Sequence, residues 1–267
     1  MRTPMNDARN TKDLSPPSTL RLPSAAQELG RVALIGSAAS VRAGVHHYLT
    51  ALGLDVVTLE PDARPRTMAR MLGTATHVVY VAVEPPLRPM LGDHLQREFG
   101  VFAQTLDSVA AHAPQARFIY ASPLSLRPNG LRERLLHRLR EPWMAYRRAC
   151  ESELALSGLP FLVLRVPPLA DQPSASTRYV LADVVRARES ARGRLPRAAL
   201  AVLIGEALRG GYPAGLRVAL YADAQGLPLA EAVAQLRRWP DHRPSVPRPT
   251  QPLAGTAASA QAVRRAA

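Results

Sequence analysis

The sequence predicts an α/β fold in which a parallel sheet is doubly wound, with helices on both faces. Segments typical of strands alternate with segments typical of helices from residue 31 onward. The strands are short apolar runs without the polar alternation of a half-exposed sheet, which is typical of strands buried on both faces. This alternation requires right-handed crossover connections and therefore a parallel sheet.

The first strand, the helix after it and the second strand form the most informative stretch of the chain. Residues 31–36, Arg-Val-Ala-Leu-Ile-Gly, predict a buried strand that ends on glycine, and a tight turn then leads into a helix. Residues 55–60, Asp-Val-Val-Thr-Leu-Glu, predict a second strand that ends on an acid. This layout holds a diphosphate at a helix N-terminus and a ribose beside a carboxylate, so the core is predicted to be Rossmann-like.

The remaining elements continue the alternation. The core should contain helix 67–72, strand 77–83, helix 95–109, strand 116–122, a long helix that ends at 157–158, and strand 160–166. Apolar residues recur at spacings of three and four in both long helices. Past residue 168 the pattern predicts helices over 179–192, 197–209 and 228–239 and a strand over 216–221.

The chain therefore divides into four segments. A polar, Pro-rich tail over 1–29 precedes the Rossmann-like core over 30–168. A small C-terminal helical, substrate-binding part of the same domain follows over 169–238, and a Pro-, Ala- and Arg-rich tail over 239–267 ends the chain. The composition of both tails favours disorder.

Composition narrows the choice of compartment and partners. No apolar run reaches the roughly 18–20 residues of a membrane span, and the N-terminus lacks the apolar core of a secretory signal. Cys150 is the only cysteine, which excludes an intramolecular disulfide and fits a reducing cytoplasm. We expect no membrane partner and no metal site.

The net charge of +13 is not interpreted as a nucleic-acid surface. Lys12 is the only lysine and aromatic residues make up 5% of the chain, so few rings are present to stack on bases. A group of arginines in the long helix and just before it is expected to form a solvated face. Its members are Arg127, Arg132, Arg134, Arg138, Arg140, Arg147 and Arg148.

The ordered set of segments resembles the short-chain dehydrogenase/reductase superfamily. The branch it resembles is the atypical and extended one, which contains NmrA-like proteins and NAD-dependent epimerase/dehydratases. The resemblance spans residues 31–238 and rests on stretches 32–36, 118–122 and 151–167, the last with a glutamate-containing helix, a Ser-Gly-Leu turn and an Arg-Val-Pro strand end. It implies an NAD or NADP cofactor, a small-molecule substrate and an oxidoreductase or epimerase/dehydratase-like activity.

The resemblance also implies where the cofactor lies. The implied cofactor-binding residues are Gly36, Ser37, Ala38, Ala39, Ser40, Arg42, Glu60 and Ala82. The family's three loop glycines correspond here to Gly36, Ala39 and Arg42. Arg42 either swings out to meet a phosphate or blocks the pocket. An ordinary strand–turn–helix with Ser37 or Ser40 as its cap is the structural alternative.

Glu60 bears on the choice of cofactor. In the resemblance its carboxylate lies near the adenosine ribose, where its charge would favour NAD over the extra phosphate of NADP. Arg64 and Arg66 follow closely and would reverse that preference. A surface glutamate in a loop is the alternative reading of Glu60.

The family's catalytic pair, a tyrosine followed four residues later by lysine, is absent. No lysine follows Lys12. One register puts Trp143 and Arg147 at the two positions, and matching residue identity gives Tyr146 and Cys150 instead. A guanidinium keeps the positive charge but does not exchange protons as an amine does.

The catalytic candidates are therefore Ser122, Tyr146 and Arg147. Ser122 falls near the family's catalytic serine or threonine, although Pro123 competes for that position. Tyr146 lies on the apolar stripe of its helix, together with Trp143 and Cys150, so a core role is the alternative. Arg147 and Glu151 are four residues apart and are expected to form a surface pair.

Two functions are consistent with these residues. One is an NAD(P)-binding enzyme with a non-standard active site. The other is a non-catalytic protein that senses a nucleotide or metabolite, or binds a partner, through a degenerate cofactor cleft. The long helices over 94–112 and 131–156 would allow a homodimer.

Overall fold

The computed structural model describes nine stretches of the chain. They are residues 30–36, 39–60, 63–82, 92–124, 131–170, 177–184, 187, 194–210 and 212–239, without the side chains of 92–94, 97 and 131–140. The expected tails, 1–29 and 239–267, lie outside these residues apart from Trp239. No helix in the described part combines the length and the apolar character that a membrane span needs.

A seven-stranded sheet in the order β2-β1-β3-β4-β5-β9-β7 forms the centre of the molecule. All neighbouring strands are parallel except β7, which runs antiparallel to β9. The strands are β1 (Arg31–Gly36), β2 (Asp55–Leu59), β3 (Ala75–Val81), β4 (Arg117–Pro123), β5 (Phe161–Val166), β7 (Tyr179–Asp183) and β9 (Leu216–Ala222). A separate parallel pair joins β6 (Leu169–Ala170) to β8 (Leu195–Pro196).

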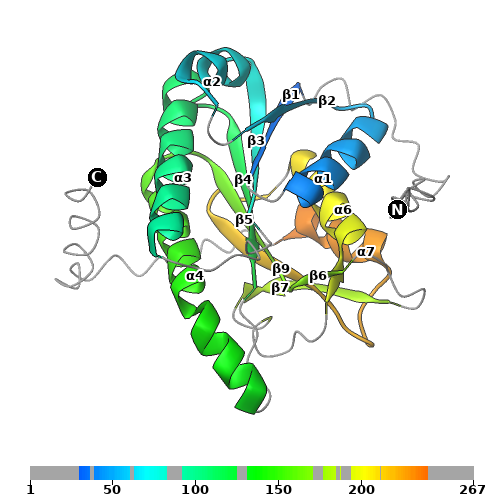
Figure 1. Ribbon diagram of the computed structural model, residues 1–267. Helices are drawn as coiled ribbons and strands as arrows, with labels where there is room; N and C mark the ends of the chain where they lie inside the picture. The colour runs from blue at the N-terminus through cyan, green and yellow to red at the C-terminus, as the bar shows by residue number, and fades with distance from the viewer. Residues whose placement is uncertain are drawn as a thin grey trace, which may run out of the picture.

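Helices cover both faces of the sheet, so the doubly wound α/β fold is confirmed (Figure 1). One face carries α1 (Ala39–Ala51), α6 (Arg197–Leu208) and α7 (Leu229–Ala234), which continues into the short 3-10 helix η2 (Gln235–Arg238). The other face carries α2 (Pro65–Leu72), α3 (Gly92–His112) and α4 (Leu131–Leu156). In Figure 1 these two groups of helices lie on opposite sides of the strands.

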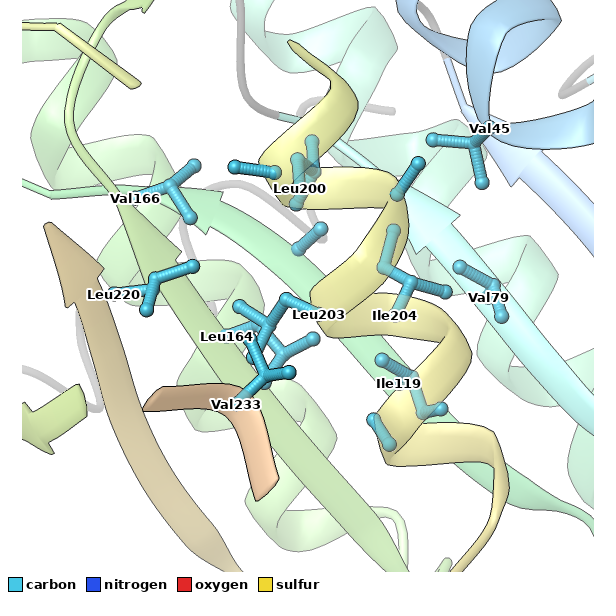
Figure 2. Packing of buried hydrophobic residues seen from close by; sticks show 14 of the residues in the cluster. Val45, Val79, Ile119, Leu164, Val166, Leu200, Leu203, Ile204, Leu220 and Val233 are labelled. Atoms are coloured by element: carbon cyan, nitrogen blue, oxygen red, sulfur yellow. The ribbon is translucent and has the colours of Figure 1, made fainter. Parts of the chain in front are cut away.

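The α6 helix anchors the first of these faces. Nine of its twelve residues are buried, and Figure 2 shows Leu203 and Ile204 among side chains of the central strands. Gly205 lets α6 approach α1, because a Cβ at this position would lie 3.2 Å from Leu52 Cδ1. This close packing fixes α1 over the end of the sheet where β1 lies.

The helix predicted over 179–192 is wrong at its start, whereas Val184 and Ala187 are helical as predicted. Tyr179–Asp183 forms β7, which pairs in register with β9 from Tyr179–Ala222 to Asp183–Val218. The backbone of β9 supplies hydrogen-bonding partners that the local sequence does not reveal, and such tertiary context overrides local propensity. Most of the rest of that predicted helix lies outside the described residues.

The strand order reverses at β1, which lies between β2 and β3. The chain reaches β2 through α1 and then crosses through α2 to β3 on the other side of β1. Among the described residues no strand lies outside β2, so β2 forms the edge of the sheet, unlike in the six-stranded Rossmann order 3-2-1-4-5-6. In open α/β sheets, ligands bind in the crevice at such a reversal, outside the carboxyl ends of the strands.

Gly36 closes β1 against β3 at this reversal. Its φ angle is +150°, a region that favours glycine, and a Cβ would lie 2.2 Å from the carbonyl oxygen of Val81. The carboxyl ends of the two strands therefore meet only because residue 36 has no side chain.

Gly36→Ala should lower the free energy of unfolding by roughly 2 kcal/mol or more, because the methyl group meets backbone atoms and the φ angle is unfavourable. The matched control is Gly44→Ala in α1, where no atom lies within 4 Å of the added Cβ. That change should raise stability by roughly 0.5–1 kcal/mol. Urea denaturation measures both, and equal effects would contradict the close approach.

Candidate functional site

The predicted cofactor residues gather around the carboxyl ends of β1 and β3. Gly36 ends β1, and α1 begins three residues later at Ala39, so the unpaired N–H groups of its first turn lie at this end of the sheet. Ala39 and Ser40 are exposed there. Ala82 follows β3 and is buried, and its N–H donates to the carbonyl oxygen of Ala121 at 2.8 Å. Ser37 and Ala38 lie outside the described residues.

Arg42 turns into the protein rather than out toward solvent. Its Nη1 donates to the carbonyl oxygen of Gly36, and its Nη2 donates to Glu60 Oε1 at 2.5 Å. The Arg42 side chain is 9% exposed, whereas that of Glu60 is 63% exposed. The guanidinium therefore links the end of β1 to the residue that follows β2.

The same end of β2 carries further positive charge. A turn joins Glu60 to α2, in which the Ala63 N–H donates to the Glu60 carbonyl at 3.0 Å. Arg64 precedes α2 and Arg66 lies in its first turn, and both are exposed. In this stretch the sequence places two acids, Glu60 and Asp62, next to Arg64 and Arg66, and Arg42 reaches Glu60 from α1.

Arg147 is buried, so the expectation that it belongs to a solvated face is wrong. Its Nη1 lies 3.4 Å from the Tyr120 hydroxyl, and its Nη2 lies 3.4 Å from Glu98 Oε2 on α3. The guanidinium carbon is 4.6 Å from the centre of the Tyr146 ring and 5.1 Å from that of Trp143. Arg147 is therefore paired with the Glu98 carboxylate and lies close to two aromatic rings. The attraction between its positive charge and the ring faces stabilises this arrangement.

Tyr146 belongs to the same buried cluster, together with Cys150. Burial raises the pKa of the Tyr146 phenol far above its ordinary value, and the nearby Arg147 charge lowers it by less. Burial likewise raises the pKa of the Cys150 thiol to about 11. Both groups stay neutral at physiological pH, as the apolar stripe of this helix predicts.

Ser122 lies on β4 beside a second buried ion pair. Its Oγ is 3.4 Å from Glu151 Oε1, and Arg165 Nη2 donates to Glu151 Oε2 at 2.7 Å. Ser122 and Arg165 are direct neighbours in the register of β4 and β5. The expected surface pair of Arg147 with Glu151 is wrong, because Arg147 pairs with the partly exposed Glu98 and Glu151 pairs with the buried Arg165.

Sequence reasoning missed the partners of both ion pairs. Glu98 lies 49 residues before Arg147, on a different helix, so no spacing within α4 indicates it. The sequence does draw attention to Glu151 and Arg165, because the glutamate-containing helix and the Arg-Val-Pro strand end are two of the segments on which the family resemblance rests. Their pairing appears only once β5 is placed beside β4.

The comparisons with known proteins agree with this architecture. No family model matches the chain, and no curated protein matches its sequence. A solved structure described as a putative NAD-dependent epimerase/dehydratase from Bacillus halodurans has a TM-score of 0.58 and 16% identity, and covers 78% of this chain and 100% of its own. The chain has a Rossmann-like α/β fold.

Two further structures share that fold at low identity. The oxidoreductase ylbE from Lactococcus lactis has a TM-score of 0.58 and 14% identity over 78% of this chain and 97% of its own. The chuY protein of E. coli CFT073 has a TM-score of 0.50 and 16% identity over 71% and 96%. At these identities the similarity shows the fold alone.

Arg147→Met should destabilise the protein by about 3–5 kcal/mol, because it removes a buried cation from the Glu98 carboxylate and from two aromatic rings. The matched control is Arg148→Met on the next residue, whose partner Glu141 is 47% exposed. That change should cost at most about 1 kcal/mol. Denaturant titration compares the two variants, and similar losses would contradict a structural role for Arg147.

The buried cluster should also make the fold sensitive to alkali. The folded state raises the pKa of Cys150 to about 11 and that of Tyr146 further, so both groups hold their protons more tightly in the folded than in the unfolded chain. The free energy of unfolding that these neutral groups contribute is complete below about pH 9 and is lost as the pH rises toward the pKa values of the folded state. The melting temperature should fall between pH 9 and 11. Cys150→Ala should move the onset upward, and an unchanged melting temperature up to pH 11 would disprove the assignment.

Proposed function

We propose that this protein binds a nicotinamide dinucleotide at the reversal between β1 and β3 and performs no tyrosine-based proton transfer. It is then a non-catalytic binding protein that senses a nucleotide through a modified cofactor cleft. The observation that carries the proposal is the enclosure of Tyr146 and Arg147 in the core beside Glu98.

The binding half of the proposal rests on the end of the sheet at Gly36. The start of α1, the glycine-closed end of β1 and the residue after β2 lie together at the end of the sheet where Rossmann folds hold a dinucleotide, which supports this half of the proposal. The similar structure from Bacillus halodurans, described as a putative NAD-dependent epimerase/dehydratase, supports the choice of a nicotinamide cofactor.

The proposed lack of catalysis rests on two features: the raised pKa of the Tyr146 phenol and the absence of the family's lysine amine. Poising a phenol near neutral pH requires lowering its pKa by about three units, or on the order of 4 kcal/mol. In this chain burial shifts the pKa of Tyr146 in the opposite direction. Arg147 supplies charge but no exchangeable proton, and its charge is already shared with Glu98.

A second candidate function uses Ser122. Its hydroxyl lies beside Glu151, which Arg165 holds in place, near the carboxyl ends of β4 and β5. A dinucleotide at the reversal would extend toward these strands. Ser122 is fully buried, so an enzyme of the oxidoreductase or epimerase/dehydratase-like type would have to expose its hydroxyl before Ser122 could donate a hydrogen bond to a substrate oxygen.

Thermal unfolding with NAD and with NADP tests the binding proposal. A dinucleotide at one hundred times its dissociation constant should stabilise the fold by about 2.7 kcal/mol and raise the melting temperature. No hydride transfer should occur with a panel of alcohols, ketones and nucleotide sugars, as followed by absorbance of the reduced cofactor.

Two variants separate the candidate functions. Turnover that Tyr146→Phe abolishes would contradict the non-catalytic proposal, whereas turnover that survives this change but is lost in Ser122→Ala would favour the second candidate. An unchanged melting temperature with both dinucleotides at millimolar concentration would refute binding itself.

A further inference from the structure

We propose that this protein holds only the adenosine diphosphate half of a dinucleotide and leaves the nicotinamide ring in solvent. Its ligands are then adenine nucleotides as a class, and it does not distinguish the oxidised from the reduced cofactor. The inference rests on the proposed function and names the ligand chemistry of the same site.

The crevice at the carboxyl ends of the strands has two halves. A Rossmann sheet consists of two mononucleotide-binding halves, and a dinucleotide spans the crevice between them. Here β1 and β2 belong to the first half, and β3, β4 and β5 belong to the second. The adenosine lies beside the acid at the end of β2, so a bound nicotinamide ring would lie over the second half.

The first half is open to solvent. Ala39 and Ser40 lie in the first turn of α1, and both are exposed. The side chain of Glu60, just after β2, is 63% exposed. A diphosphate can therefore approach the unpaired N–H groups at the start of α1, and an adenosine can lie beside them.

The second half is closed at the ends of its strands. Val81, Ser122 and Val166 lie at or next to the carboxyl ends of β3, β4 and β5, and all three are fully buried. The Ser122 Oγ lies 3.4 Å from Glu151 Oε1, so this hydroxyl is engaged inside the protein. These strand ends offer a nicotinamide ring no accessible side chain among the three.

Side chains of α3 and α4 fill the space beside the same strands. Arg147 of α4 pairs with Glu98 of α3, and the ring of Phe99 lies edge-on to that of Tyr146 with their centres 6.4 Å apart. A ring that entered here would have to separate a buried cation from its carboxylate and displace packed aromatic side chains. Both changes are costly.

The open half and the closed half together define the ligand. The adenosine and the diphosphate make the contacts, and the nicotinamide ring makes none. ADP-ribose, which is NAD without its nicotinamide base, keeps every group that the open half can hold. The nicotinamide ring is also the part of the cofactor that changes on reduction, so NAD and NADH should bind alike.

Isothermal titration of the full chain with NAD, NADH and ADP-ribose tests the inference. The three dissociation constants should agree within about threefold. Nicotinamide mononucleotide, which lacks the adenosine half, should not bind at millimolar concentration. The fluorescence emission of bound NADH should match that of free NADH, because its ring stays in water.

A charge at the start of α1 tests where these ligands bind. Ala39→Glu should weaken the binding of NAD, NADH and ADP-ribose by the same factor of at least about ten, because its carboxylate repels the diphosphate. The helix dipole favours an acid in this turn, so the variant should fold. The matched control, Ala145→Glu, adds the same charge at an exposed position of α4 and should change no affinity.

The other outcomes separate the inference from the proposed function. NAD or NADH that binds more than about threefold more tightly than ADP-ribose would overturn the inference and leave the proposed function intact. Binding of nicotinamide mononucleotide, or a shifted emission of bound NADH, would do the same. Binding of neither NAD nor ADP-ribose, or NAD binding that Ala39→Glu leaves unchanged, would refute the proposed function itself.

Discussion

The contact between the carboxyl ends of β1 and β3 is the constraint on which the rest of the structure depends. Gly36 brings its backbone so close to the Val81 carbonyl that a side chain would not fit. This contact fixes where α1 begins and where the Gly36 carbonyl points, and Arg42 binds that carbonyl. On the other side of α1, Gly205 allows α6 to pack closely, so the helix is held from two directions.

Two of the buried arginines, Arg42 and Arg147, replace residues that the family resemblance implies. Arg42 stands where the resemblance implies a glycine, and Arg147 stands, in one of the two registers, where it implies a lysine. Each pairs with a glutamate, Glu60 or Glu98, that comes from a different element. Arginine keeps its charge when buried and gives up no proton, so both changes favour fixed binding electrostatics over proton transfer.

The sequence predicted the fold well because its strands and helices differ in hydrophobic period, and the two long helices, α3 and α4, carry clear apolar stripes. It failed at Tyr179–Asp183, where the backbone of β9 decides the structure and no local pattern does. It located Arg42 in the loop motif but left its direction open. That direction depends on Gly36 and Glu60, which only the folded sheet brings together.

The buried cluster around Arg147 shows a second reason for failure. A helix of this composition offers Glu151 at a favourable spacing, and a surface pair satisfies every rule that applies to an isolated helix. The actual partner comes from α3, and Arg147 lies inside the protein. The burial of Tyr146 and Cys150 could be predicted from their positions on the apolar stripe of the helix, because that prediction does not depend on knowing which residues they contact.

A crystal structure of the protein grown with NAD or NADP tests the central claim most directly. The account predicts the diphosphate at the start of α1, beside the end of β1 at Gly36. A dinucleotide bound elsewhere, or crystals that contain no dinucleotide, would contradict it.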